Sequence, residues 1–134
     1  FSAAVSDSKP IKFINTKIKE KAIIIKTKNN RDIIKTLGAK KGSRFLVGFA
    51  LETDNEEKNA IEKMKSKNVD LMILNSLKDK DSCFGYNTNK IKMIYNNEAV
   101  KDYPLMQKSE VAKVILDEVL FKIEHESSIK KILK

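Results

Sequence analysis

The chain has 134 residues, 41% of them hydrophobic and 34% charged, which excludes a disordered chain and fits one globular domain. Its net charge of +9 attracts anions such as nucleotides, nucleic acid or membrane surfaces, although lysines spread along the whole chain are more simply explained by a biased genome. The single cysteine excludes an internal disulfide and favours a reducing cytoplasm, and no stretch approaches the run of about 18 apolar residues that spans a membrane.

The first predicted elements are the end of a strand and an arm. Residues 1–5, FSAAV, are small and apolar and lead into Ser6-Asp7, which is typical of a buried strand that ends at the rim of a parallel sheet. A chain that starts within a strand is expected to be part of a longer polypeptide. Residues 13–28 alternate lysine with isoleucine and then become β-branched, so we expect an extended arm or hairpin.

A helix and a strand are predicted next. Residues 29–42 form the helix, with Asn30 as its cap, Asp32 in its first turn and Gly38 at its C-terminal end. Residues 45–52, FLVGFALE, are continuously apolar and predict a central strand that is covered on both faces.

A second helix is predicted from Thr53 to about residue 68, because Thr53 and Glu56 have the spacing of a capping box. Residues 70–77 predict another buried strand, and residues 90–95 predict a strand with one face more exposed to solvent. Loops are expected at 83–89 and 96–104. Ser109 is expected to start a long helix, and the apolar residues that should face inward are Val111, Ile115, Val119 and Ile123.

Buried strands that alternate with helices predict an α/β fold with a mainly parallel sheet and helices on its faces, in three α/β/α layers. We expect one domain over residues 1–126 and a frayed basic tail over 127–134.

Polar residues follow three of the predicted strands. Ligands of open parallel sheets bind beyond the C-terminal ends of the strands, which places Asp7, Thr53 and Asn75 near one rim. Helix capping is the better explanation of Thr53. For Asp7, a turn and a ligand contact are equally good explanations.

Two groups of lysines could bind phosphate. Lys63 and Lys67 share one helix face, and their mutual repulsion would be relieved by an anion between them. Lys17 and its alternate neighbours would share one face of the arm, which could close over a polyphosphate. On spacing alone, a solvated helix face and an edge kept soluble by lysine are the favoured interpretations.

The other reactive residue types give no site. His125 stands apart from possible ligands and Cys83 apart from a histidine, so we expect a surface residue and an inert thiol. The patterns GxGxxG, GxxxxGK[ST], HExxH and GxSxG do not occur. The absence of tryptophan and the few aromatics also argue against a stacking platform for single-stranded nucleic acid.

Seven segments identify a family when they are taken together. AAVSD, KIK, NRDII, VGFALET, the Lys63/Lys67 pair, KNVDLMILNSL and FGYNTNKI follow one another in an order and spacing that resemble the phosphopantothenate–cysteine ligase family. This ligase is the synthetase part of the bifunctional coenzyme A biosynthesis flavoprotein of bacteria. The resemblance covers nearly the whole chain and matches the C-terminal half of the ligase domain.

The resemblance implies a Rossmann-like, dimeric, cytoplasmic enzyme of coenzyme A biosynthesis. Such an enzyme activates the carboxylate of 4′-phosphopantothenate with CTP and Mg²⁺, releases pyrophosphate and forms an acyl-cytidylate. The amine of cysteine then displaces CMP. FMN would belong only to a fused decarboxylase domain, and neither nucleic acid nor a membrane is an expected partner.

The resemblance also assigns roles to residues. The family's arm is a flap whose lysine is needed for turnover, so Lys17 becomes the catalytic candidate. The nucleotide contacts would fall on Ala3, Asp7, Lys17, Arg31, Asp32, Ile33, Ile34, Phe49, Lys63 and Lys67. The start of the first helix would offer free N–H groups to an anion or to base edges.

The chain departs from the family at three points. Arg31 stands where the helix-start motif usually has proline, which loosens that start, and Ser8 replaces the usual aromatic residue. The family's first half, with its glycine-rich loop and a catalytic asparagine, has no counterpart. The isolated chain is therefore expected to be inactive, and to dimerise or otherwise hide an exposed sheet edge. A basic nucleic-acid-binding module and an inactive structural fragment remain as alternatives.

Overall fold

The computed structural model describes residues 5–19, 21–79 and 81–132, with only the backbone course described for 126–132. The elements run in the order β1 (Ser8–Pro10), β2 (Thr27–Asn29), α1 (Ile33–Ala39), β3 (Val47–Glu52), α2 (Glu56–Lys67), β4 (Leu71–Ser76), β5 (Thr88–Asn89), β6 (Ile91–Tyr95), β7 (Val100–Asp102), β8 (Met106–Gln107) and α3 (Lys108–Ile132).

The main sheet has four strands in the order β3-β4-β6-β7. Strands β3 and β4 are parallel, whereas β4 pairs antiparallel with β6 and β6 antiparallel with β7. The predicted α/β class is confirmed, but the sheet is mixed rather than mainly parallel. The link from β4 to β6 contains turns and the short strand β5 instead of a helix, so the chain reverses direction there.

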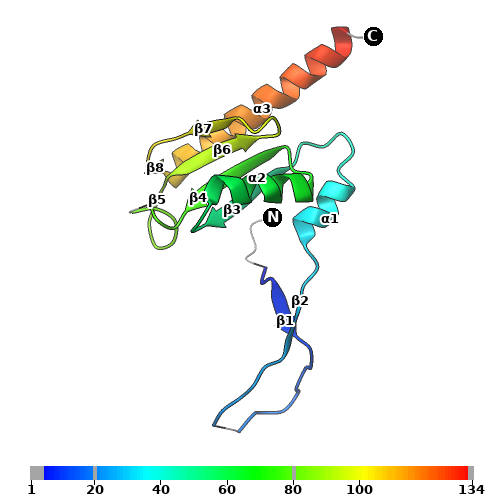
Figure 1. Cartoon of the computed structure of the whole chain (residues 1–134), viewed down its shortest axis with the longest axis vertical. Coiled ribbons are helices and arrows are strands. Elements are labelled where there is room, and N and C mark those ends of the chain that lie inside the picture. The colour runs from blue at the N-terminus through cyan, green and yellow to red at the C-terminus, as the bar shows by residue number, and fades with distance from the viewer. Residues whose placement is uncertain (1–4, 20, 80, 133–134) are drawn as a thin grey trace.

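Helices cover both faces of the sheet, as the three-layer prediction requires (Figure 1). On one face, Ala60 and Met64 of α2 pack with Met72, Leu74 and Ile94 from the sheet. On the other face, α3 packs against a second cluster, which is formed by Leu71, Ile73, Ile91, Met93 and Val111. Strand β4 contributes to both clusters, which explains its continuous apolar sequence.

Strand β3 differs from the prediction of a central strand covered on both faces. Its register buries Ala50 and Glu52 but leaves Phe49 65% exposed and Leu51 37% exposed. Strand β3 lies at the edge of the sheet among the described residues, and α2 packs on the face that carries Ala50. On the other face only Val47 packs against the second core cluster among the described residues of β3.

Both predicted N-caps are wrong. Helix α1 begins at Ile33, and the side chain of Asp32 rather than that of Asn30 accepts the capping hydrogen bond. Helix α2 begins at Glu56 after a left-handed Asn55, with no side-chain cap. The carboxylate of Glu56 instead accepts a 2.7 Å hydrogen bond from Ser76 Oγ, so the expected capping box does not form.

The C-terminal half contains short strands that the sequence did not predict. Strands β5 and β8 pair with each other, and β7 extends the main sheet within a segment expected to be a loop. Helix α3 starts at Lys108, and Ile123, which was expected to face inward, is 44% exposed. The helix continues to Ile132 and so includes residues 127–132 of the predicted tail.

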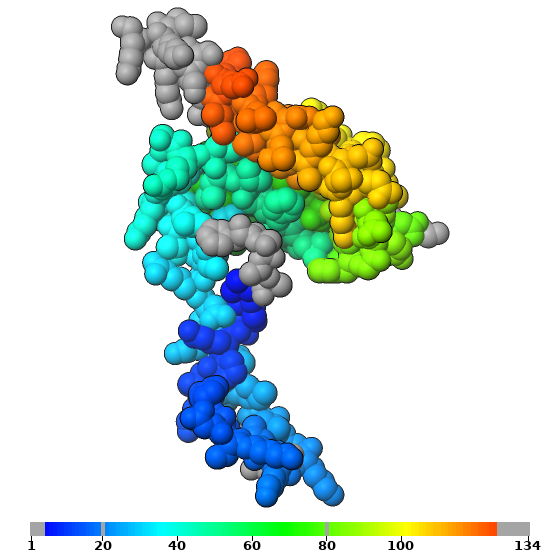
Figure 2. All heavy atoms as spheres, turned by 180° about the vertical axis from the view of Figure 1, so that it is seen from behind, coloured from blue at the N-terminus to red at the C-terminus, as the bar shows by residue number. Residues whose placement is uncertain are grey.

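The predicted arm projects from the base of the domain (Figures 1 and 2). Its base is the antiparallel pair β1–β2, in which Ser8 lies opposite Asn29, and no further strand is assigned in the part of the arm that the structure describes. Phe13 and Ile24 are 89% and 92% exposed. The strand expected over residues 1–5 lies outside the described residues except for Val5. No helix in the described ranges is both long and apolar enough to cross a bilayer.

Candidate functional site

A cleft of about 810 Å³ opens beside β3. Three parts of the chain line it: residues 5–7 before the arm, residues 29–34 with Leu37 at α1, and Leu46, Val47 and Phe49 at β3. Lys67 reaches it from the end of α2. The lining includes seven of the residues assigned through the family resemblance: Asp7, Arg31, Asp32, Ile33, Ile34, Phe49 and Lys67.

Asn30 holds the two strands of the arm together at the cleft. Its backbone N–H donates to the carbonyl of Asp7 over 2.8 Å, and its side-chain amide donates to the carbonyl of Ser6 over 2.7 Å. This residue, which sequence reasoning took for a helix cap, fixes the position of Asp7 relative to α1.

Asp32 and Lys67 form the ionic centre of the cleft. The Asp32 carboxylate accepts a 2.9 Å hydrogen bond from the backbone N–H of Lys35 and lies 3.2 Å from Lys67 Nζ. The Lys35 N–H and, less strongly, the Lys67 ammonium lower the pKa of Asp32 against the opposing effect of burial. Asp32 is therefore ionised at neutral pH, and Lys67 is held at the cleft by a partner that a stronger anion could replace.

Close packing of α1 against α2 places Lys67. A Cβ added to Gly38 would lie 1.8 Å from the Lys67 carbonyl oxygen, so only glycine fits there. The Asn68 side chain, at the left-handed cap of α2, donates to the Gly38 carbonyl over 2.9 Å. Gly38 was expected to end α1, but the helix continues to Ala39 and the glycine serves this contact.

One wall of the cleft is apolar and open to solvent. Phe49, Ile33 and Leu37 line it and are 65%, 41% and 37% exposed. Ile34 differs from them because it also packs against the α2-side core. An exposed phenyl ring beside aliphatic side chains is suited to contact a flat heterocycle.

Arg31 points along α1, where its Nε donates to Thr36 Oγ1 over 3.1 Å. Lys63, one turn before Lys67, is not among the residues that line the cleft. Its Nζ lies 2.5 Å from the carboxylate of Glu52, which is 8% exposed and also accepts a hydrogen bond from Asn59.

Lys17 lies in the arm, is exposed and does not line the cleft. The arm points away from the sheet in Figure 1. The structure thus brings Asp32 and Lys67 together and leaves Lys63 and Lys17 outside the cleft in a single chain. Ala3 lies outside the described residues.

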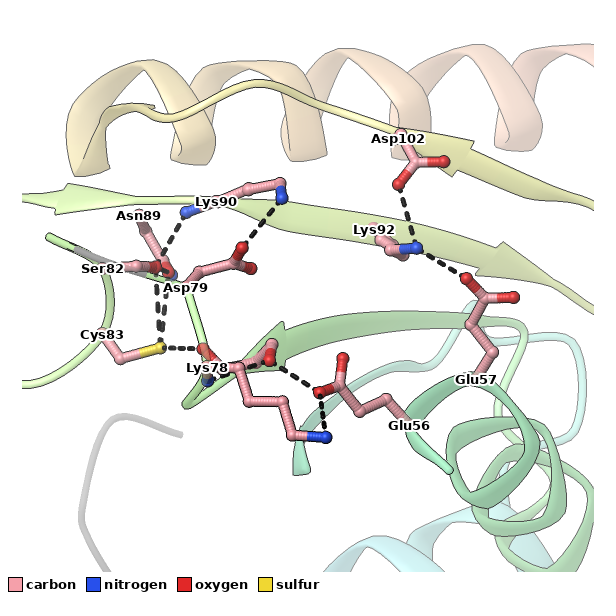
Figure 3. A network of polar contacts seen from close by, with 11 residues as sticks. Glu56, Glu57, Lys78, Asp79, Ser82, Cys83, Asn89, Lys90, Lys92 and Asp102 are labelled. Atoms are coloured by element: carbon pink, nitrogen blue, oxygen red, sulfur yellow. Dashed lines mark hydrogen bonds and ion pairs between the residues drawn. The ribbon is translucent and has the colours of Figure 1, made fainter. Parts of the chain in front are cut away.

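The two other residues expected at the strand ends do not reach the cleft. The Thr53 hydroxyl donates a hydrogen bond to its neighbour Asp54. Asn75 belongs to a separate polar network, in which its side-chain oxygen accepts a 3.0 Å hydrogen bond from the side-chain amide of Asn89. This network also joins Ser82 and Cys83, and ion pairs of Lys78, Lys90 and Lys92 lie around it (Figure 3). Its polar groups bond one another, and none of these residues lines the cleft.

No group of three or more histidine, cysteine, aspartate or glutamate side chains in the described residues could hold a metal ion. Asp7 and Asp32 are the carboxylates of the cleft. Because Lys35 and Lys67 occupy the oxygens of Asp32, Asp7 is the carboxylate more open to a further ligand.

Comparisons with known proteins give a consistent family. A sequence model described as the DNA/pantothenate metabolism flavoprotein C-terminal domain matches residues 1–122. The chain is 42% identical to the coenzyme A biosynthesis bifunctional protein CoaBC of Borreliella burgdorferi over 120 residues, covering 86% of the chain and 30% of the relative. It is also 42% identical to a cysteine/cysteine sulfinic acid decarboxylase of an unknown prokaryotic organism, covering 89% of the chain and 34% of that relative.

A solved structure supports the same relationship. The crystal structure of a C-terminal domain of CoaBC superposes with a TM-score of 0.64 at 33% identity. The match covers 74% of this chain and 48% of that domain. The chain therefore spans about a third of these curated relatives and about half of the solved domain.

Proposed function

The chain belongs to the DNA/pantothenate metabolism flavoprotein C-terminal domain family, and from this membership we propose that it supplies the nucleotide-binding half of a phosphopantothenate–cysteine ligase. The reaction would serve coenzyme A biosynthesis in the cytoplasm. The 4′-phosphopantothenate carboxylate attacks the α-phosphorus of CTP and displaces pyrophosphate. The cysteine amine then attacks the acyl carbon and displaces CMP.

The observation that carries this proposal is the meeting of Lys67, Asp32 and an exposed aromatic wall in one cleft. An ammonium group held by a partly exposed carboxylate can turn to phosphate oxygens, which bear more charge. Phe49 would then lie against the pyrimidine ring.

Lys63 would join Lys67 only after leaving Glu52. The two lysines are one helical turn apart, so an anion beside Lys67 also attracts Lys63. Because the Glu52 pair is short and its carboxylate is buried, this release opposes binding. We propose that the pair keeps Lys63 fixed until the triphosphate arrives.

Lys17 requires either movement of the arm or a second subunit. We propose that the chain acts as a homodimer in which the arm of one subunit closes over the cleft of the other. The exposed apolar residues of the arm, including Phe13 and Ile24, favour a contact with protein. Lys17 would then offset the charge that develops on the phosphates.

Magnesium would reach the cleft with the nucleotide. Mg²⁺ bound to substrate phosphates needs only one or two protein carboxylates, and Asp7 fits that requirement. The ion would neutralise phosphate charge. FMN would belong to a fused decarboxylase domain.

Calorimetric titration with CTP and ATP, each with Mg²⁺, tests nucleotide binding by the whole chain. We expect CTP to bind more tightly than ATP. Lys67→Ala should weaken CTP binding by about 10- to 100-fold, since it removes a charge-assisted contact. Lys65→Ala is the matched control, because Lys65 lies on the same helix but pairs with the exposed Glu98. Equal binding of CTP and ATP, or equal effects of the two variants, would contradict the proposal.

A second candidate, binding of nucleic acid, is favoured by the charge of the arm. Its lysines are exposed where the structure describes them and include Lys9, Lys12, Lys17, Lys19, Lys21, Lys26 and Lys28. This candidate predicts tight binding of a DNA oligomer that weakens steeply with salt. The ligase proposal predicts indifference to the oligomer at physiological salt.

A further inference from the structure

A second pocket, of about 360 Å³, lies between α3 and the end of β6. Helix α3 continues past the end of β6 at this point (Figure 1). Four segments of the chain line the pocket: Phe45 before β3, Asp70 before β4, Tyr95 and Asn96 at the end of β6, and Phe121, Lys122 and His125 of α3. None of these residues lines the cleft beside β3, so the two cavities are separate features of the molecule.

Aromatic rings are concentrated in this pocket. The chain has six phenylalanines and three tyrosines, and three of these nine rings, those of Phe45, Tyr95 and Phe121, line it. Phe45 and Tyr95 pack against the core cluster beneath α3, so their positions are fixed. Phe121 is 59% exposed, and its ring centroid lies 5.8 Å from that of His125. Two fixed rings beside an exposed ring are suited to contact a flat aromatic molecule.

The charged groups of the pocket favour an anion. Lys122 Nζ lies 4.7 Å from the centroid of the Tyr95 ring, and no carboxylate of the described residues lies within ion-pair distance of it. The lining carboxylate, Asp70, has both oxygens occupied, one by Lys41 Nζ at 2.6 Å and the other by the backbone N–H of Leu46 at 2.7 Å. An ammonium group over an aromatic face gives up little when it turns to a carboxylate.

Glu118, one helical turn before Lys122, also has a partner. Its carboxylate lies 3.7 Å from Lys101 of β7. Burial and then the nearby Glu118 carboxylate raise the pKa of Tyr95, so the Tyr95 ring stays neutral. An anion at Lys122 therefore meets a neutral ring on β6, and the Glu118 charge is balanced by Lys101.

Size and charge together decide the class of ligand. Pockets for small ligands measure roughly 300–1,000 Å³, so this one suits a molecule of one or two fused rings rather than a nucleoside triphosphate. Asp70 in the lining would repel a polyphosphate more strongly than a singly charged group. We propose that the pocket binds a planar aromatic carboxylic acid, with its ring against Phe45 and Phe121 and its carboxylate on Lys122.

This inference goes beyond the proposed nucleotide binding and is independent of it. The proposed CTP site is the cleft beside β3, which shares no lining residue with this pocket. A chain that binds no nucleotide can still bind the aromatic acid, and a chain that binds no aromatic acid can still bind CTP.

NMR titration of the whole chain with 2-naphthoate tests the proposal. We expect a Kd of about 1 mM, as is usual for a ligand of this size, and shifts of the backbone amides grouped at residues 45, 70, 95, 96 and 121–125. 2-Naphthamide has the same rings without the charge, and decalin-2-carboxylate has the charge without aromatic rings. Each should bind about fivefold more weakly or worse. CTP with Mg²⁺, added second, should leave 2-naphthoate bound.

Substitutions on α3 then separate the roles of charge and ring. Lys122→Met removes the charge but keeps an apolar stem, so it should weaken binding of 2-naphthoate about fivefold and leave that of 2-naphthamide unchanged. Lys113→Met is the matched control, because Lys113 is exposed on the same helix and does not line the pocket. Phe121→Ala should weaken binding of both compounds. Leu120→Ala, at a neighbouring position that is 57% exposed, should weaken neither.

Four results would overturn the inference. They are no binding of 2-naphthoate up to about 10 mM, shifts at the residues of the cleft instead of the pocket, binding of 2-naphthamide as tight as that of 2-naphthoate, and equal effects of Lys122→Met and Lys113→Met. Circular dichroism checks that each variant is folded. The comparison of the three compounds uses the unsubstituted chain, so it stays decisive if a variant does not fold.

Discussion

Lys63 Nζ lies 2.5 Å from the carboxylate of Glu52, and the carboxylate is the buried partner of this pair. Lys63→Ala leaves the charged Glu52 without its ammonium, so we expect a loss of about 1–3 kcal/mol in the free energy of unfolding. Lys65→Ala breaks an exposed pair on the same helix and should cost at most about 1 kcal/mol. Urea denaturation measures both. If both variants lose the same unfolding free energy, burial of Glu52 does not make its ion pair with Lys63 more stabilising than the exposed pair.

Gly38 allows α1 to touch the end of α2. In Gly38→Ala the new methyl group would meet the Lys67 carbonyl, so the two helices must separate. We expect a loss of about 1–3 kcal/mol in unfolding free energy and weaker CTP binding, because Lys67 moves with the end of α2. Lys58→Ala, on the exposed face of α2, should stay within about 0.5 kcal/mol of the parent. If Gly38→Ala is as stable as the parent, the close approach is unimportant.

Asp32 should make stability depend on pH in the acid range. Its pKa is lower in the folded chain than the ordinary 3.8, so its ionised form stabilises the fold above that value. This stabilisation is lost as pH falls through the lower, folded-state pKa. Asp32→Asn keeps a capping side chain but cannot ionise. The difference in unfolding free energy between parent and variant should therefore shrink between pH 6 and about pH 3. If the difference in unfolding free energy stays constant over this pH range, ionisation of Asp32 does not contribute to acid unfolding.

Much of the fold follows from local patterns. The segment around β4 is apolar at four successive positions, which is typical of a strand covered on both faces, and its predicted bounds lie within one residue of the observed strand. The same reasoning fails for β3. Gly48 and Ala50 on its buried face are as apolar as Phe49 and Leu51 on its open face, so alternation is invisible in the sequence.

The errors at helix ends have a common cause. Glu56 has the spacing of a capping residue, but Ser76, distant in sequence, is closer to its carboxylate in the fold. Asn30 is likewise drawn to the backbone of Ser6 and Asp7. The hydrogen-bond partners of Glu56 and Asn30 come from distant segments of the chain. Residue spacing within a helix therefore cannot predict them.

The site shows the same limit. Spacing placed Lys63 and Lys67 on one face but could not show that Glu52 holds the first and Asp32 the second. The family resemblance supplied the positions that line the cleft. The reason why Lys67 reaches it, namely the contact of Gly38 with the end of α2, emerges only from the packed helices.

The position of the arm makes a specific prediction for the enzyme that contains both halves of the domain. Lys17 lies outside the cleft of its own chain, whereas Lys67 lines it. If Lys17 acts across a dimer, a Lys17→Gln subunit and a Lys67→Ala subunit together form one complete cleft. At CTP concentrations too low for Lys67→Ala to bind it, each variant alone should lack turnover, and a random mixture should regain about a quarter of the parent activity, since about half of the dimers are hybrids with one complete site. Pyrophosphate release in each sample measures the first step separately. Lys17→Gln homodimers should still release pyrophosphate but fail to form product with cysteine. A mixture as inactive as its components would show that the arm serves its own cleft, and normal turnover of Lys17→Gln would remove this lysine from the mechanism.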